Sequence, residues 1–398
     1  MTTRVNSRKR ADSATYAASG VNTKFGNDAS KVLYEAAKLT WENRRGGLGE
    51  VVELFKDFSG LRAVDVGGLP KGTFMNINFD GVGTKIEVAE RIAEHRTVAF
   101  DLFAMVCDDA VVRGAEPVLV GSILDVKSLG KDGRPYINFV KQLAAGYVDA
   151  AKQANVAVVN GEVAELGARV NGFGDFNYNW GAGVVWFAKK SRMITGLKVK
   201  KGDALVGLRE EGFRSNGLSL ARKILRKVEG DGWHHAAYQD ENVARLVLQP
   251  SIIYSAAVVE MFGGFNGEPK ARINGIAHIT GGGMPEKLGR MLKPSGLGAN
   301  ISNPFWPPDI MHHLQEIGRV RDREAYTTWN MGQGMIMATP EPDKVVKIAN
   351  RHGISAKQIG EVAKSPKIVI KNYGYEDLKR ELEFGLIGTV RNKLRFSV

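Results

Sequence analysis

The sequence predicts an α/β (α+β) fold built from two domains. Segments with strand character alternate with segments of helical periodicity along most of the chain, and glycine-rich loops follow several of the strands. With 398 residues, of which 43% are hydrophobic and 25% charged, the chain has enough apolar material for two cores. A charged turn at 198–203 precedes the second half, so we expect domains at 1–190 and 191–398.

The first half begins with a polar segment, residues 1–15, that we expect to be flexible. Farther along, Met75, Ile77 and Phe79 alternate with asparagines, which indicates a strand that ends at Asp80. Periodic apolar residues predict helices, and β-branched runs predict strands. The remaining predicted elements are helices at 30–45, 97–113 and 136–154 and strands at 118–126, 156–159 and 182–187.

The second half repeats the order strand, loop and helix. A strand is predicted at 204–208, a loop at 210–217 and a helix at 218–228. The triple glycine 281–283 opens a further predicted helix, because glycines commonly mark the turn before one. The charged segment after about residue 370 reads as an extra tail.

Composition narrows the class of protein. The formal charge of +12 is scattered, without the aromatic interleaving of a single-strand binder, so we do not expect nucleic acid. A generally solvated surface and a field that favours small anionic ligands both remain open. No apolar stretch is long enough to cross a membrane and the N-terminus lacks a secretion signal, so we expect a cytoplasmic protein. Cys107 is the single cysteine, which excludes an intramolecular disulfide and a cysteine-built zinc site.

The segment Asp80-Gly81-Val82-Gly83-Thr84-Lys85 follows the alternating strand. It offers an anionic metal ligand, two glycines that let backbone N–H groups approach phosphate oxygens, and a lysine for negative charge. The GxxxxGK[ST] spacing of the Walker loop is absent. A nucleotide-handling loop and a glycine turn that only redirects the chain therefore both remain open.

Acidic residues recur through the first half. Asp101 and Asp108 lie seven residues apart on one predicted helix, and Asp109 is turned about 100° away. Glu162 follows a short buried strand, where functional groups of α/β sheets often lie. Carboxylates without clustered histidines suit Mg²⁺ held between protein and nucleotide phosphates. The alternatives are a helix cap for Asp101, solvent exposure for the Asp108-Asp109 pair and a simple turn at Glu162.

His278 precedes the triple glycine and could contact a substrate, although a hydrogen-bonded core histidine is the commoner case. No Ser-His-Asp or Cys-His arrangement is legible.

Seven segments share their order with one enzyme family. They are DGVGTK (80–85), FDLFAMVCDDAVVRGAEP (100–117), NGEVAEL (160–166), EGFRSNGLSLARKIL (211–225), AHITGGG (277–283), WNMGQGM (329–335) and IGEV (359–362). On these segments the chain, from about residue 16 to about 370, resembles the aminoimidazole ribonucleotide synthetase (phosphoribosylformylglycinamidine cyclo-ligase) family of purine biosynthesis. The resemblance implies two α/β domains and a homodimer whose N-terminal strands form an intersubunit β-barrel, with ATP in a nearby groove.

The implied reaction uses ATP to phosphorylate the formyl amide oxygen of formylglycinamidine ribonucleotide. The amidine nitrogen then attacks the activated carbon and phosphate leaves, which gives aminoimidazole ribonucleotide, ADP and phosphate. Such a reaction requires substrate positioning and charge neutralisation more than a nucleophile. Magnesium is therefore the expected metal and ATP the expected cosubstrate.

The hypothetical site residues fall into three overlapping groups. As metal ligands we expect Asp80, Asp109 and Glu162, and as catalytic residues Lys85, Asp109 and Asn216. The nucleotide and phosphate contacts expected are Asp80, Gly81, Gly83, Thr84, Lys85, Asp101 and Asp108. The substrate contacts expected are Arg214, Ser215, Asn216, Gly217, His278, Thr280, Gly281, Gly282 and Gly283, the last four at a helix N-terminus suited to a 5′-phosphate.

Several positions depart from the family pattern. The family usually has Asn-Asp at Asp108-Asp109, His at Arg214, Thr at Val163 and Arg at Ile252. These changes leave two alternatives open: another ATP-dependent member of the superfamily, of the small-molecule kinase type, or a non-catalytic nucleotide-binding descendant. The N- or C-terminal cysteines of selenophosphate synthetase and of the carbamoyl-dehydrating hydrogenase maturation factor are absent.

Overall fold

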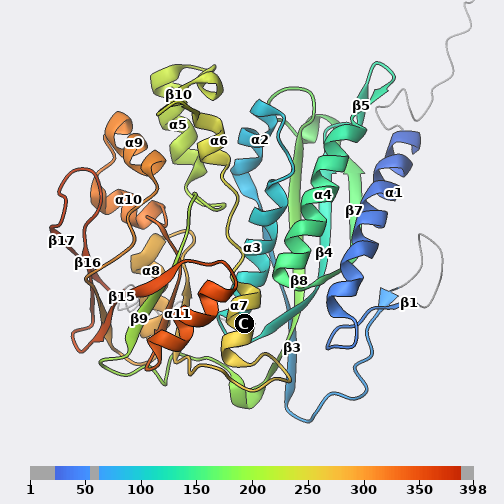
Figure 1. The fold of residues 1–398 in the computed structure, drawn as a ribbon. Coiled ribbons are helices and arrows are strands. Elements are labelled where there is room, and N and C mark those ends of the chain that lie inside the picture. Colours follow the sequence, from blue (N-terminus) through green and yellow to red (C-terminus); the bar gives the residue numbers. More distant parts are fainter. Residues whose placement is uncertain (1–22, 54–61, 387–398) are drawn as a thin grey trace, which may run out of the picture.

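The computed structural model describes residues 23–53 and 62–386, so the expected flexibility of 1–15 lies outside the described residues. The first half forms a four-stranded sheet in the order β3-β8-β4-β7, with strands β3 (Thr73–Gly81), β8 (Tyr178–Lys189), β4 (Glu116–Val126) and β7 (Ala157–Glu165). Helices α1 (Thr23–Thr40), α3 (Val98–Val111) and α4 (Ile137–Ala154) pack along the sheet (Figure 1).

The two faces of this sheet differ sharply. Leu124, Trp180 and Val184 are buried beneath the helices. On the opposite face Met75, Phe79 and Ile123 are 61%, 73% and 56% exposed. The predicted alternation in β3 is therefore present, but its apolar residues point to solvent in the single chain. Glycine at position 183 leaves room for the Phe79 ring on this face, because a Cβ there would lie 2.5 Å from that ring.

The second half forms a seven-stranded sheet in the order β12-β14-β9-β15-β13-β16-β17. Its strands are β9 (Ala204–Arg209), β12 (Gly275–His278), β13 (Gly298–Ile301), β14 (Gln333–Thr339), β15 (Ala356–Ala363), β16 (Lys367–Lys371) and β17 (Glu381–Gly385). Helix α8 (Gly283–Leu292) packs on β12, β13 and β16, whereas α11 (Pro342–Arg351) packs on β9 and β15.

The other elements connect or cover these sheets. The helices are α2 (Ile86–Ile92), α5 (Leu218–Glu229), α6 (Val243–Leu248), α7 (Ser255–Phe262), α9 (Asp309–Gly318) and α10 (Asp322–Thr328). Short strand pairs are β1 (Val52–Glu53) with β2 (Arg62–Ala63), β5 (Gly130–Lys131) with β6 (Arg134–Pro135), and β10 (Ala237–Tyr238) with β11 (Glu241–Asn242). The short 3₁₀ turns are η2 (Trp41–Arg44), η3 (Gly83–Lys85), η4 (Gly167–Arg169), η5 (Lys190–Arg192) and η6 (Trp233–His235). Helix α7 contacts α3, and one hydrophobic cluster includes residues of both halves.

The segment after residue 370 is not a free arm in the part that the structure describes. Strand β17 pairs antiparallel with β16 and extends the sheet. The loop between β16 and β17 is held in place by buried Asp322, which accepts hydrogen bonds from the backbone N–H groups of Glu376 and Asp377. The sequence missed this strand because its glutamates hide the alternation of Leu382 and Phe384.

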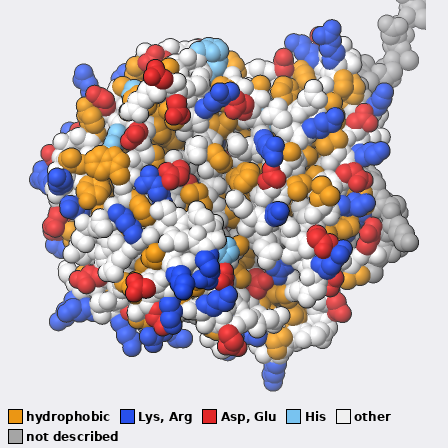
Figure 2. All heavy atoms as spheres, viewed as in Figure 1, with side chains coloured by type: hydrophobic (Ala, Val, Ile, Leu, Met, Phe, Trp, Pro, Cys, Tyr) orange, Lys and Arg blue, Asp and Glu red, His pale blue; other side chains and the backbone are white. Residues whose placement is uncertain are grey.

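None of the helices within the described ranges is long and apolar enough to cross a membrane. Figure 2 shows lysines and arginines interspersed with acidic residues on the face in view, in line with the scattered charge expected from the sequence.

Candidate functional site

Three loops that are far apart in sequence meet where the two halves join. The turn after β3 lies against the loop before α5, since a Cβ on Gly83 would be 3.9 Å from Ser215 O. Thr84 Oγ1 is also 3.3 Å from Ser219 Oγ. A Cβ on Gly281 would lie 3.5 Å from Asn216 Nδ2, which joins the triple-glycine loop to the same place. The tertiary fold thus gathers three of the predicted glycine loops.

Asp109 and His278 form the acidic side of this junction. His278 Nδ1 is 2.6 Å from Asp109 Oδ1. His278 is buried, whereas the Asp109 side chain is 49% exposed. Burial alone would raise the pKa of Asp109, but the His278 hydrogen bond and the charges of Lys287 and Arg214 hold it below its usual value. Asp109 is therefore an accessible, ionised carboxylate.

Asp80 is the second carboxylate of the junction. Its pKa is raised by burial and, to a smaller extent, by the negative charge of Asp109, despite a hydrogen bond from the Gly81 N–H. A carboxylate whose pKa is raised by burial and by a neighbouring carboxylate gains from a nearby cation. Lys287 on α8 supplies positive charge to both. Lys287 is not among the residues predicted from the sequence. Its position in the helix that directly follows the triple glycine is the feature that could have indicated it.

Buried polar atoms without partners point to a ligand. Ser215 Oγ and Asn216 Oδ1 are buried and have no hydrogen-bond partner among the described residues. Such atoms are costly to leave unpaired, so they are typical of places where a ligand or water completes the bonding. Gly217 and Gly282 have φ angles of +77° and +91°, which their loops require and which L side chains rarely adopt. The expected substrate contacts at Asn216, Thr280 and Gly281 remain compatible with this arrangement.

Lys85 and Asp101 contact each other inside the protein. The Lys85 side chain is fully buried, with Nζ 2.7 Å from Asp101 Oδ1 and 2.5 Å from Gln249 O. Ser251 Oγ donates a further hydrogen bond to Asp101. Neither charged group faces the junction in this structure, so the phosphate and nucleotide contacts expected of them stay predictions.

Arg214 and Asp108 also pair inside the protein. Both are fully buried, and Arg214 Nη2 lies 2.8 Å from Asp108 Oδ2. Arg214 Nη1 lies 2.7 Å from Glu210 Oε2, which is also buried. Neither side chain reaches the surface, so the expected contacts of Arg214 with a substrate phosphate and of Asp108 with nucleotide stay predictions. Both residues depart from the family pattern, and they contact each other.

Glu162 does not join Asp80 and Asp109 within one chain. The strand register places Gly81, Gly181, Ile123 and Glu162 in one row across the sheet. Three strand spacings correspond to about 14 Å between the Asp80 edge and the Glu162 edge. Across the described ranges, no group of three or more His, Cys, Asp or Glu side chains is arranged to hold a metal ion.

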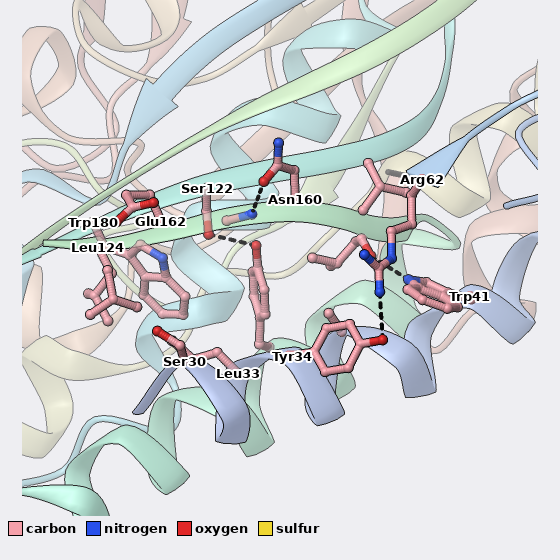
Figure 3. A pocket seen from close by; sticks show the side chains of 16 residues that line it. Ser30, Leu33, Tyr34, Trp41, Arg62, Ser122, Leu124, Asn160, Glu162 and Trp180 are labelled. Carbon is pink, nitrogen blue, oxygen red and sulfur yellow. Dashed lines mark hydrogen bonds between the residues drawn. The ribbon is translucent and has the colours of Figure 1, made fainter. Parts of the chain in front are cut away.

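Glu162 instead lines a pocket of about 520 Å³ at the β7 edge of the sheet (Figure 3). The walls come from α1, η2, α4 and strands β2, β4, β7 and β8, and they include the aromatic side chains Tyr34, Trp41, Tyr147 and Trp180. Trp180 is buried and its Nε1 has no hydrogen-bond partner among the described residues. Ser122 and Asn160 add polar groups. An aromatic pocket of this volume with a few polar groups suits a planar, drug-sized ligand.

The fold is that of a two-domain α/β protein in which glycine loops and two carboxylates meet where the halves join. Models for AIR synthase related proteins match residues 63–179 (N-terminal domain) and 200–371 (C-terminal domain). The chain is 33% identical to phosphoribosylformylglycinamidine cyclo-ligase of Thermococcus kodakarensis, over 90% of this chain and 98% of that protein. It is 34% identical to the Carboxydothermus hydrogenoformans protein of the same name, with the same coverage. The chain belongs to the phosphoribosylformylglycinamidine cyclo-ligase family.

Solved structures share the fold at low identity. Thiamine-monophosphate kinase from Stenotrophomonas maltophilia gives a TM-score of 0.55 at 13% identity, covering 84% of this chain and 94% of that chain. Hydrogenase maturation protein HypE in complex with ATP gives 0.54 at 13% identity, covering 83% and 88%. The predicted α/β class and family are confirmed.

Proposed function

We propose that the protein catalyses the ATP-dependent cyclisation of formylglycinamidine ribonucleotide to aminoimidazole ribonucleotide, with release of ADP and phosphate. The observation that carries the proposal is identity above 30% to relatives named for this activity over almost their whole length. The two ligand sites support it, since the reaction needs a nucleotide and a sugar phosphate. The kinase-type alternative has weaker support, because the kinase neighbour is 13% identical.

The chain's own residues have separate tasks in this reaction. The loop that carries Asn216 and the glycines that open α8 face the junction, where backbone N–H groups suit the 5′-phosphate of a ribonucleotide. Lys287 supplies positive charge beside the carboxylates as phosphate charge develops. The aromatic pocket at Trp180 would hold the base of ATP, with Trp180 Nε1 as a donor.

Magnesium fits the donor set at the junction. Asp80 and Asp109 are oxygen ligands of the kind that Mg²⁺ prefers, and a cation would offset the unfavourable effect of Asp109 on ionised Asp80. When bound there, Mg²⁺ would neutralise charge on the transferred phosphoryl group. We propose these two carboxylates as its ligands in this chain.

We further propose a homodimer that joins the outer faces of the four-stranded sheets. The exposed apolar stripe of Met75, Ile77, Phe79 and Ile123 loses unfavourable hydration when it is covered. Strands β3 and β7 are the edges of the sheet, and closing two such sheets into one barrel would place the β7 edge of one copy beside the β3 edge of the other. The pocket with Glu162 would then adjoin the Asp80 edge of the partner, which accounts for their separation within one chain.

The domain division near residue 190 is part of the same proposal. The four-stranded sheet ends with β8 at Lys189 and the seven-stranded sheet begins with β9 at Ala204, so each sheet draws on one side of that boundary.

The activity is tested by incubating the purified protein with ATP, Mg²⁺ and formylglycinamidine ribonucleotide. We expect stoichiometric ADP and a diazotisable aromatic amine, the product. ADP release without amine would favour the kinase alternative, and nucleotide binding without turnover would favour a non-catalytic descendant.

The dimer is tested with Phe79→Asp, which places a charge on the apolar stripe. Sedimentation should show a dimer for the unmodified protein and a monomer for the variant. Leu197→Asp is the matched control, because Leu197 is 69% exposed but lies in the loop before β9. A monomeric unmodified protein would reject the proposed interface.

Sharing of the site between subunits is tested by mixing two inactive variants, Asp109→Asn and Glu162→Gln. If each site takes Asp109 from one subunit and Glu162 from the other, refolded mixtures regain about a quarter of the activity, since half of the dimers are mixed and each has one intact site. No recovery would place both residues in one subunit's site.

A further inference from the structure

Arg214 is the centre of a buried ionic network. Its guanidinium contacts the carboxylates of Glu210 at 2.7 Å and Asp108 at 2.8 Å, and all three side chains are fully buried. Nη1 also donates to Ile252 O at 2.9 Å. The Arg214 backbone has a φ of +58°, a conformation that L side chains rarely adopt. The surrounding contacts therefore hold both the backbone and the side chain in one arrangement.

The network fixes the proton on His278. Arg214 Nη2 lies 2.8 Å from His278 Nε2. A guanidinium donates hydrogen bonds and accepts none, so Nε2 must be the acceptor. The imidazole proton then lies on Nδ1, from which it is donated to Asp109 Oδ1 at 2.6 Å. The direction of each hydrogen bond from Arg214 to Asp109 follows from the chemistry of the arginine.

We propose that Arg214 is a positioning residue that holds the His278 ring through the hydrogen bond to Nε2 and thereby orients Asp109. Glu210 and Asp108 hold the guanidinium, the guanidinium orients the imidazole, and the imidazole donates from Nδ1 to Asp109 Oδ1. The Asp109 side chain stays 49% exposed, so the remainder of the carboxylate faces the junction that it shares with Asp80. The catalytic consequence rests on the proposed function, whereas the hydrogen bond to Nε2 does not.

The tautomer can be read directly by imidazole ¹⁵N NMR of protein labelled in its seven histidines, with His278→Gln to assign the signal. At neutral pH we expect His278 in the neutral Nδ1–H form. In Arg214→Met the Asp109 carboxylate still keeps the proton on Nδ1, but the donor to Nε2 is lost, so we expect the Nε2 resonance to move toward that of an imidazole nitrogen without a hydrogen bond. Arg245→Met is the matched control, because Arg245 is 67% exposed and pairs with Glu94 far from the network; its His278 signal should not change.

Arg214→Met leaves two buried carboxylates without a cation, and the variant could fail to fold. The triple variant Glu210→Gln, Asp108→Asn, Arg214→Met removes the three charges together and keeps the test valid. It too should show the displaced Nε2 resonance. Arg214→Lys, which keeps the charge and an N–H donor group, should leave the Nε2 resonance closer to its wild-type position than Arg214→Met.

Turnover supplies the second readout. The kcat for ADP release should fall about 10- to 100-fold in the triple variant, as for partners that orient metal-ligating side chains, while KM for ATP changes little. Arg214→Lys should recover part of kcat. A wild-type His278 in the Nε2–H form, or an Nε2 resonance and a kcat that do not change in the folded variants, would overturn the proposal. A protein that shows the expected Nε2 resonances but no cyclisation would reject the proposed function instead.

Discussion

The two ends of helix α3 hold buried carboxylates in opposite ways. At the N-terminal end, Asp101 is sealed against Lys85, and both side chains are fully buried. At the C-terminal end, buried Asp108 pairs with Arg214. The next residue, Asp109, contacts buried His278, but about half of its own side chain is exposed to solvent. The first cluster is closed, whereas the second connects the interior to an accessible carboxylate.

This difference shows that a buried charge indicates function only when its hydrogen bonds lead to an open site. Lys85 has the charge and the glycine-rich loop expected of a phosphate contact, yet its ammonium group donates to two protein acceptors, Asp101 Oδ1 and Gln249 O. Asp109 and Lys287 have solvent access and carry the opposite charges that a phosphorylated ligand and its metal require.

The largest expected effect is on stability at the closed end. Lys85→Met should lower the free energy of unfolding by about 3–5 kcal/mol, because it leaves Asp101 charged and unpaired in the interior. Urea denaturation measures this loss. Turnover per folded molecule should stay close to the wild-type value, and a folded variant with no ADP release would return Lys85 to the chemistry.

Two variants calibrate that measurement. Lys85→Met combined with Asp101→Asn removes both charges and should recover part of the lost stability. Arg96→Met removes a pair with Asp149 whose side chains are 63% and 44% exposed, and it should cost less than about 1 kcal/mol.

At the open end the effect should fall on activity. Asp109→Asn keeps the shape and the His278 contact but removes the charge, so kcat for ADP release should fall about 10²-fold or more. The free energy of unfolding should change by less than about 1 kcal/mol, because the side chain is half-exposed. Near-normal turnover in this variant would remove Asp109 from the site.

A smaller expected effect is the pH dependence of the free energy of unfolding, to which one histidine near each end of helix α3 contributes. Burial lowers the pKa of His95, whose backbone carbonyl accepts a hydrogen bond from Val98 at the start of α3, to about 4. Burial, together with the charge of Arg214, lowers the pKa of His278 to about 4 as well. The unfolded chain takes up these protons near pH 6.5, before the folded protein does, so stability is present above pH 6.5 and falls as the pH drops toward 4.

Each histidine should contribute a slope of up to about 1.4 kcal/mol per pH unit in that window. Asp108 acts in the opposite direction, because burial raises its pKa to about 7. The measurement is therefore a difference between variants in urea denaturation at several pH values. His95→Gln and His278→Gln should each reduce the pH dependence of the free energy of unfolding by the equivalent of about one bound proton. Only His278→Gln should also lower turnover. Equal effects of both variants on turnover would contradict the distinction between the ends.

Much of the fold was readable from the sequence. The helix predicted at 97–113 is α3 at Val98–Val111, and the strand predicted at 204–208 is β9 at Ala204–Arg209. These succeeded because each contains an uninterrupted apolar pattern. The predicted helix at 30–45 begins earlier, at Thr23, and its last turn is the 3₁₀ segment η2. Strand β17 was missed because its charged residues mask the alternation.

The site was readable in part. The sequence singled out Asp80, Asp109, Asn216 and His278, and the fold brings the loops that carry them to one junction. It could not show that Lys287 and Trp180 line the two candidate sites. Neither lies in a pattern with special spacing, and their surroundings come from segments distant in the chain.

By itself the sequence determined the alternation of elements, the glycine loops and the family, because these depend on local periodicity and on ordered motifs. Tertiary structure decided which charges are open to ligands. Lys85 meets Gln249 across 164 positions of the chain, and Arg214 meets Asp108 across 106. The physical reason is that the state of a charge depends on its desolvation and on its partners, and both are set by side chains that only folding brings together.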